Sequence, residues 1–400
     1  MKKKPVRLAM DSENEKSIKF EIDGHKQSGN YTWFRGDNAN FNPKLANLRG
    51  SDSALRFIVK GWEPKEPYIT KSTKVVAFGS CFATNITAWL ANRNYQVLTD
   101  KQESKSSAYV VRFGEGMVNT FVIRQQFEWA FEGKKFEEAL WHGYDAEEFG
   151  YDEDVRIETA NLFNSADLFI ITLGLSEIWY DEVTGGVFWR AVPSSKYDAT
   201  RHKFRVSSVS ENKENIHAII DLIKTHRPNA KVIFTLSPIP LVATFRAQSC
   251  MTANSVSKAI LRSALDEVIR ERNDSDTVHY WPSYEIVMDL FDNVWREDRR
   301  HVKKEILDFI MTLFECVWCV DSKLSMSLSK AWFLALSATD ALPPNLLQAL
   351  SDNDYERVMK IVKRHSGKNE GSDIPLLRSI VEEYAKEQPD GIATRVLEAM

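Results

Sequence analysis

Short apolar runs alternate with longer amphipathic stretches from Lys74 onwards, and this alternation constrains the fold more than any other feature. Four runs have the length and composition of buried strands, at 75–78, 168–172, 231–236 and 277–281. Longer stretches carry apolar residues at helical spacing, at 83–92, 117–131, 212–226, 256–272 and 302–317. Continuous apolar strands separated by helices are typical of a parallel sheet that is covered on both faces. The sequence therefore predicts an α/β fold, a three-layer α/β/α sandwich over about residues 71–320.

The two ends of the chain lack this alternation. Residues 1–70 contain many Gly, Asn and Asp residues, which predicts an N-terminal extension packed over the core. After residue 320 the strand-like runs stop, and residues 321–400 are expected to form a small helical module. Its helices are expected at 324–337, 346–350, 354–363 and 374–386. We expect this module to be dispensable for the main domain and available to a protein partner.

The bulk properties exclude several classes of function. The 400 residues carry a net charge of −4, which gives no general attraction to nucleic acid. No apolar run approaches the roughly 20 residues that span a bilayer, and acidic residues follow the basic start where a signal peptide would be apolar. Four cysteines make no disulfide framework at this length. These features predict a cytoplasmic protein with reduced thiols, no membrane span and no nucleic-acid partner.

The segment Gly79-Ser80-Cys81-Phe82-Ala83 joins the first expected strand to the first expected helix. A serine in such a turn presents its Oγ at the carboxyl edge of the sheet, where α/β folds keep their sites. The helix N-terminus supplies free N–H groups and positive potential for a developing oxyanion, and Gly79 allows a substrate to approach the backbone. Ser80 is thus a candidate nucleophile, and a simple helix cap is the alternative interpretation. Cys81 is the rival nucleophile, although a buried apolar role is the commoner one for a free cysteine.

A serine nucleophile needs a base, and His301 is the best placed of the eight histidines. It follows the last expected strand region and precedes a helix, on a loop that can reach the carboxyl edge of the sheet. Asp298, three residues earlier, could accept the Nδ1–H of the imidazole and turn Nε2 toward the nucleophile. The alternative is that Asp298 caps the helix expected near Val302 and that His301 is an exposed residue of its first turn.

The segment 79–83 resembles the signature of the GSCFA family, a branch that is similar to SGNH/GDSL hydrolases. Further blocks resemble the family in the same order, at 171–179, 236–245, 257–262, 280–289 and 298–302. The resemblance covers roughly residues 30–320. It implies a flavodoxin-like fold of the SGNH type, with Ser80 as nucleophile, His301 as base and Asp298 as the orienting acid.

This resemblance also implies a reaction and a class of substrate. The expected activity is that of a serine esterase acting through an acyl-enzyme on O-acyl esters, plausibly of an O-acetylated glycan. The alternatives are an acyltransferase with the same residues, and a non-catalytic module that binds a glycan or a protein. No cofactor or metal is expected. Cys316-x-x-Cys319 has metal-like spacing, but it has no second pair and lies in an apolar helix, so we interpret it as packing.

The oxyanion donors depart from the SGNH pattern, in which a glycine N–H and an asparagine side chain assist the nucleophile's own N–H. After the second expected strand the chain reads Gly174-Leu175-Ser176-Glu177, with no asparagine at that place. Ser176 could replace it, or Asn119 could, with Gly116 giving close approach to the backbone. Turn chemistry explains these residues equally well. Trp141, Trp179, Trp189 and Trp281 are expected in the core, with one or two able to stack on a sugar ring near the site.

Overall fold

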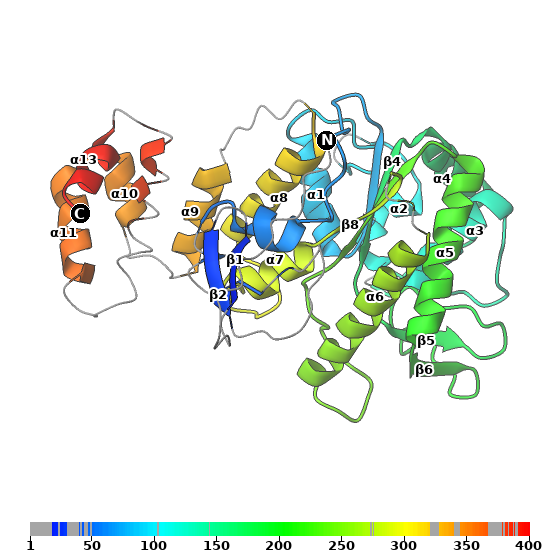
Figure 1. The fold of residues 1–400 in the computed structure, drawn as a ribbon. Coiled ribbons are helices and arrows are strands. Elements are labelled where there is room, and N and C mark those ends of the chain that lie inside the picture. The colour runs from blue at the N-terminus through cyan, green and yellow to red at the C-terminus, as the bar shows by residue number, and fades with distance from the viewer. Residues whose placement is uncertain are drawn as a thin grey trace.

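A parallel four-stranded sheet forms the centre of the molecule, in the order β3-β4-β7-β8 (Figure 1). Its strands are β3 (Val75–Gly79), β4 (Leu168–Leu173), β7 (Lys231–Leu236) and β8 (Val278–Trp281). The expected strands are confirmed, with ends that differ by at most one residue. The computed structural model describes residues 18–22, 25–29, 40, 42–43, 47–48, 50–101, 104–143, 145–272, 274, 276–320, 328–339, 345–366, 378, 381–382, 384–386, 388 and 391–400.

Helices connect the strands, as the sequence predicts. The expected helices correspond to α1 (Cys81–Ala91), α3 (Thr120–Glu132), α5 (Val209–His226), α6 (Cys250–Arg272) and α8 (Lys304–Trp318). The sequence interpretation missed α2 (Tyr109–Arg112), α4 (Glu153–Ser165) and α7 (Ser283–Leu290). Within α4 only Thr159 and Phe163 are buried, so this helix has almost no apolar periodicity to detect. Its start does carry a signal, because the Asp152 side chain accepts a hydrogen bond from Val155 N at 3.0 Å.

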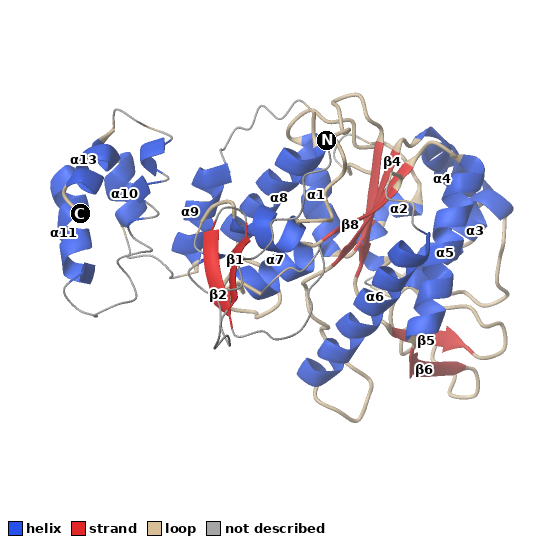
Figure 2. Ribbon diagram, in the orientation of Figure 1, coloured by secondary structure: helices blue, strands red, loops and turns tan. Residues whose placement is uncertain are grey.

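Each face of the sheet has its own hydrophobic core, because successive residues of a strand point to opposite faces. One buried cluster joins alternate strand residues to α1, α7 and α8, and it contains Val75, Ala77, Leu168, Ile170, Phe82, Ile286 and Phe309. The other joins the intervening strand residues to α3, α5 and α6, and it contains Val76, Phe78, Phe169, Ile171, Phe127, Ile219 and Leu265. Figure 2 shows the helices on both sides of the sheet. The architecture is therefore the three-layer α/β/α fold that the sequence predicts.

Two antiparallel hairpins lie outside the main sheet (Figure 2). The first is formed by β1 (Ile18–Ile22) and β2 (His25–Gly29), within the expected N-terminal extension. The second is formed by β5 (Glu177–Asp181) and β6 (His202–Val206), which the sequence interpretation did not predict. Because β5 starts four residues after β4 ends, this hairpin begins close to the carboxyl edge of the sheet.

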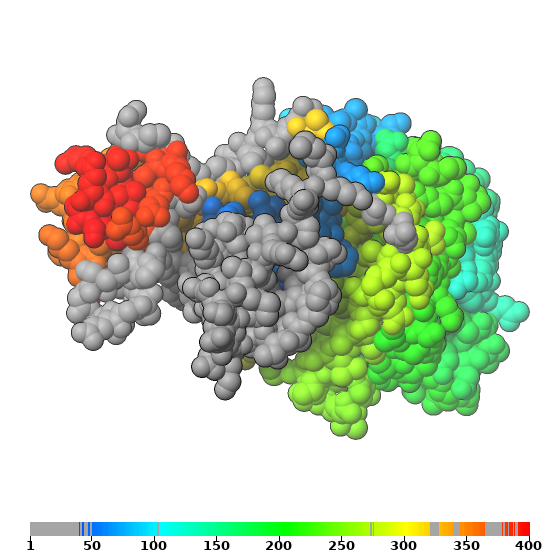
Figure 3. Space-filling model, in the orientation of Figure 1, coloured from blue at the N-terminus to red at the C-terminus, as the bar shows by residue number. Residues whose placement is uncertain are grey.

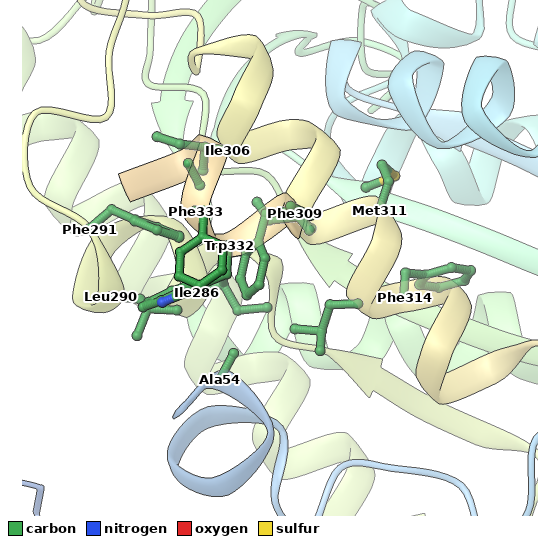
Figure 4. Close-up of a cluster of buried hydrophobic side chains, with 14 of the residues drawn as sticks. Ala54, Ile286, Leu290, Phe291, Ile306, Phe309, Met311, Phe314, Trp332 and Phe333 are labelled. Atoms are coloured by element: carbon green, nitrogen blue, oxygen red, sulfur yellow. The ribbon is translucent and has the colours of Figure 1, made fainter. Parts of the chain in front are cut away.

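The helix α9 (Leu328–Ala338) packs on α8 and completes the core on that side. The ring of Trp332 lies 5.2 Å from that of Phe309 and 5.1 Å from that of Phe291, between centroids (Figure 4). A chain that ended near residue 322 would therefore expose Phe309 and its neighbours to water. We propose that the C-terminal module begins after α9 and not at residue 321.

Beyond α9, further helices lie at one end of the molecule, in orange and red in Figure 3, and their buried residues continue the hydrophobic cluster of α8 and α9. They are α10 (Leu346–Ser351), α11 (Tyr355–Ser366) and α13 (Ile392–Glu398). The first two agree with the helices expected at 346–350 and 354–363, whereas most of the expected helix at 374–386 lies outside the described residues. Among the helices of the described ranges, none combines the length and the apolar character that crossing a bilayer requires.

Candidate active site

The turn between β3 and α1 fixes Ser80 against the neighbouring strand. Gly79 has a φ of +133°, and a Cβ at this position would lie 2.2 Å from the carbonyl oxygen of Thr172, so the turn requires glycine. The N–H of Ser80 donates to that same oxygen at 3.2 Å. Because Thr172 belongs to β4, the position of Ser80 is set by the sheet.

Ser80 is the N-cap of α1, and its Oγ accepts a hydrogen bond from Phe82 N at 3.2 Å. The residue is only 6% exposed. The capping role weighed from the sequence is thus confirmed. It does not exclude a chemical role, because a hydroxyl that accepts a bond keeps its own proton to donate.

The loop from Arg296 to His301 is organised by the side chain of Asp298. Its Oδ2 bonds the Nδ1 of His301, and its Oδ1 accepts from the N–H groups of Arg300 and His301 at 3.0 Å each. These three hydrogen bonds hold the pKa of Asp298 well below its usual range, and the bond from the imidazole has the largest effect. Arg296 N donates to the carbonyl of His301 at 2.8 Å and closes the loop. The structure therefore brings together the acid and the imidazole that the sequence pairs.

The alternative interpretation of Asp298 as a helix cap is wrong. The helix α8 begins at Lys304, and its N-cap is Lys303, which makes no capping bond through its side chain. The carboxylate of Asp298 is engaged instead with the imidazole and the backbone of its own loop. The side chains of Asp298 and His301 are 48% and 47% exposed, so the pair lies at the surface.

A cavity of about 210 Å³ connects this loop to the first turn of α1. We call it the His301 cavity. Its lining includes Cys81 and Phe82 from α1, Glu115, Ile239 from the loop after β7, and His301. No hydrogen bond joins Ser80 Oγ to His301 in the described part of the chain, and Ser80 is not among the residues that line this cavity. Catalytic hydrogen bonds of this kind are commonly long in the absence of substrate.

Cys81 is not the buried apolar residue that the sequence suggests. It is half-buried, and it lines the same cavity as His301. Burial raises the pKa of its thiol, and the carboxylate of Glu115 raises it further, against the lowering effects of its own backbone N–H, Arg300 and Arg190. The thiol therefore stays protonated near neutral pH, which makes it a weak nucleophile.

The two candidates for the second oxyanion donor, Asn119 and Ser176, differ in how their polar groups are engaged. Asn119 is the N-cap of α3 and accepts from Val122 N at 3.0 Å through Oδ1, a role that leaves its amide N–H groups as donors. Ser176 is fully buried, and both its N–H and its hydroxyl contact Ser257 Oγ, at 2.8 and 3.3 Å.

The glycines near these donors serve close packing. A Cβ on Gly116 would lie 2.5 Å from the Arg190 guanidinium, and the N–H of Gly116 donates to Phe113 O at 2.8 Å. The N–H of Gly174 donates to Val118 O at 2.7 Å. Both N–H groups therefore have partners, and these glycines contribute room for the backbone and for Arg190.

Sequence reasoning missed the role of Lys258, which ties together two loops at the carboxyl edge of the sheet. This lysine is buried in α6, and its Nζ donates to Gly174 O at 2.6 Å and to Ile239 O at 2.8 Å. Burial lowers its pKa to about 7. With Ser257, it holds the loops after β4 and β7 in place beside the site. The sequence did contain a signal for this role, because Lys258 lies within the apolar face of the expected helix at 256–272.

The other residues singled out from the sequence divide between core and site. Trp141 and Trp281 are fully buried in the two cores, as expected. Trp179 and Trp189 line a second cavity near Asn119. At the end of α8, Cys316 is half-buried and Cys319 is buried, and burial raises their pKa values to about 11 and about 12.

Comparison with known proteins adds one finding to this geometry. The model of the GSCFA family matches residues 74–314, which is more than half of the chain. The matched region contains the four strands of the main sheet together with Ser80, Asp298 and His301. A comparison with curated proteins finds no match.

Proposed function

We propose, from the premise that this chain belongs to the GSCFA family, that it is a serine-dependent hydrolase of O-acyl esters. The observation that carries the proposal is the Asp298–His301 pair, whose imidazole shares a cavity with the first turn of α1. Ser80 is the N-cap of that helix. A carboxylate-oriented imidazole beside a serine at a strand-to-helix turn can activate the hydroxyl as a nucleophile.

In the proposed reaction, Ser80 Oγ attacks the carbonyl carbon of the ester while His301 Nε2 takes the hydroxyl proton. The tetrahedral intermediate then collapses, the bond to the alcohol oxygen breaks, and His301 returns the proton to that oxygen. Water attacks the resulting acyl-enzyme by the same route and releases the acid. Asp298 stays ionised throughout and holds the imidazole through Nδ1.

The oxyanion would be stabilised from two directions. The N-terminus of α1 contributes positive potential at Ser80, and the amide of Asn119 contributes a preorganised donor. The guanidinium of Arg190, whose charge reaches the neighbouring thiol of Cys81, adds further positive potential. These groups need no reorganisation when charge develops on the carbonyl oxygen.

Exposure favours hydrolysis over acyl transfer. Nearly half of the His301 side chain is open to solvent, so water has direct access to the base. An acyltransferase with the same residues would have to keep water away from the acyl-enzyme. The proposed substrate is an O-acyl ester of an alcohol, and if no ester is cleaved the protein is instead a non-catalytic binding module.

Two measurements on the full chain test the proposal. Hydrolysis of 4-nitrophenyl acetate is followed with the wild-type protein, and an alkyl fluorophosphonate is used to label the nucleophile. We expect turnover, and we expect the phosphonyl group on Ser80 by tandem mass spectrometry, with no label on Ser80→Ala protein. Label on Cys81 would assign the thiol as nucleophile. If neither turnover nor labelling were observed, the esterase proposal would be wrong and the alternative of a non-catalytic binding module would remain.

A further inference from the structure

A second cavity, of about 300 Å³, is lined in part by Val118 and Asn119 at the start of α3. We call it the aromatic cavity. It is enclosed by the β5–β6 hairpin, by the segment before it and by the loop after β7. Most of its lining is apolar, and the larger side chains are Trp179, Phe188, Trp189, Phe204, Leu241 and Phe245.

The loop after β4 links the aromatic cavity to the turn that carries Ser80, because Ser80 N donates to Thr172 O and Leu175 lines the cavity. Val118 and Asn119 line it, and the carbonyl of Val118 receives the N–H of Gly174 at 2.7 Å, in the same loop. Arg190 also lines it, lies against Gly116, and acts electrostatically on the thiol of Cys81 at the start of α1.

Part of the lining of the aromatic cavity consists of aromatic rings that contact one another. The rings of Trp179 and Phe245 meet edge to face with centroids 5.0 Å apart, and Phe204 lies 5.4 Å from Phe245. Phe245 is 54% exposed and Val242 is 73% exposed at the rim. Exposed apolar side chains around a hollow mark a place where a ligand covers them.

The chemistry of the proposed site decides which part of an ester enters each cavity. His301 must give its proton to the leaving alcohol, so the alcohol lies on the side of the His301 cavity. The acyl group extends from Ser80 away from the base. We take this direction to be that of Asn119, the candidate oxyanion donor, which also lines the aromatic cavity.

We propose that the aromatic cavity binds an aromatic ring carried by the acyl group of the ester, and that the protein prefers arylacetyl esters to acetyl esters. This inference rests on the proposed function. An apolar cavity of about 150 Å³ holds benzene, so the space suffices for a ring with a short linker. A sugar ring fits less well, because its hydroxyls need several polar partners and the carboxylate of Glu177 is already engaged by Thr244 Oγ1, at 2.9 and 2.8 Å.

The first arm of the test measures binding without turnover. Ser80→Ala protein is titrated with phenylacetamide, with acetamide and with methyl glucoside, and the fluorescence of Trp179 and Trp189 in the cavity reports occupancy. We expect saturable binding of phenylacetamide only. The additional change Phe245→Ala should weaken it up to about tenfold, the size of one lost aromatic contact. Met288→Ala, at an exposed apolar residue of α7, is the matched control and should change nothing.

The second arm measures hydrolysis of ethyl phenylacetate and ethyl acetate by the wild-type chain. We expect the larger kcat/KM with ethyl phenylacetate, and we expect Phe245→Ala to lower kcat/KM for ethyl phenylacetate by a larger factor than for ethyl acetate. Equal rates for the two esters with no binding of phenylacetamide would overturn the inference and leave the esterase proposal standing. Binding of phenylacetamide without cleavage of any ester would overturn the esterase proposal alone. Binding of methyl glucoside instead would assign the cavity to a sugar.

Discussion

The two halves of the candidate site are held in place by different parts of the molecule. Ser80 is buried at the end of β3, and its backbone bonds to β4, so its position follows from the sheet. Asp298 and His301 lie half-exposed on a loop whose order comes from its own hydrogen bonds. The difference teaches that the candidate nucleophile is positioned by the core, whereas the candidate base is oriented by hydrogen bonds within its own loop.

The largest expected effect is that of Ser80→Ala. Loss of a nucleophile lowers kcat/KM by a factor on the order of 10⁴ or more. The fold should survive, because the helix loses only one capping bond, worth about 1 kcal/mol. Ester hydrolysis and circular dichroism check the two halves of this prediction.

Cys81→Ala is the control for that comparison, since the thiol lies one residue away and lines the His301 cavity. We expect it to keep most of the activity. If Cys81→Ala abolished turnover while Ser80→Ala retained it, the assignment of Ser80 as the nucleophile would be wrong.

The next effect is that of Asp298→Asn, which we expect to lower kcat/KM by about 10²–10³. The carboxylate is ionised over the working pH range because its pKa is held well below its usual range, so it does not itself cause an acid limb in the rate profile. An amide in its place can favour the wrong imidazole tautomer, which leaves Nε2 protonated and unable to take the proton of Ser80.

Ester hydrolysis by the wild-type and Asp298→Asn proteins under the same conditions measures this ratio. Labelling by fluorophosphonate should still occur in the variant, only more slowly, since Ser80 is untouched. A variant as active as the wild type would show that the reaction does not depend on this carboxylate.

Gly79→Ala tests the turn that positions Ser80 against β4. The new Cβ meets Thr172 O at 2.2 Å and the φ of +133° is unfavourable for alanine, so we expect a loss of about 3 kcal/mol in the free energy of unfolding. Gly185→Ala is the matched control. Its φ is +73° but nothing lies within 4 Å of the added atom, so only about 1 kcal/mol should be lost. Urea unfolding curves of both variants decide between a clash and a purely conformational cost.

The smallest effect is expected for Arg299→Gly in the loop half. Arg299 has a φ of +53°, a conformation that glycine adopts freely, and the bonds of Asp298 involve Arg300 and His301 only. We expect the free energy of unfolding to change by less than about 0.5 kcal/mol and kcat/KM to stay within a factor of about two. A tenfold loss of activity would show that the loop depends on the guanidinium, and the contrast with the Ser80 turn would fail.

Sequence reasoning recovered the sheet because its strands are continuous apolar runs with buried residues throughout. It did not recover the β5–β6 hairpin, since Glu177 follows β4 almost directly and β6 is mostly half-buried. It found the Asp298–His301 pair from a three-residue spacing, which is a local relation. The hydrogen bonds between Ser176 and Ser257, which engage one candidate oxyanion donor, are contacts across 81 residues. Neither they nor the aromatic cavity, which joins residues 118 to 245, leave a local pattern to detect.

The buried lysine that ties the loops after β4 and β7 couples the folding of this protein to the release of a proton. Lys258 has a pKa of about 7 in the folded chain and its ordinary value of 10.5 in the unfolded one. Between these values the unfolded chain binds more protons, so the free energy of unfolding rises with pH through this range, with a limiting slope of about 1.4 kcal/mol per pH unit from this group. The measured heat of unfolding should accordingly depend on the ionisation enthalpy of the buffer above pH 7, and that dependence should disappear when Lys258 is replaced by methionine.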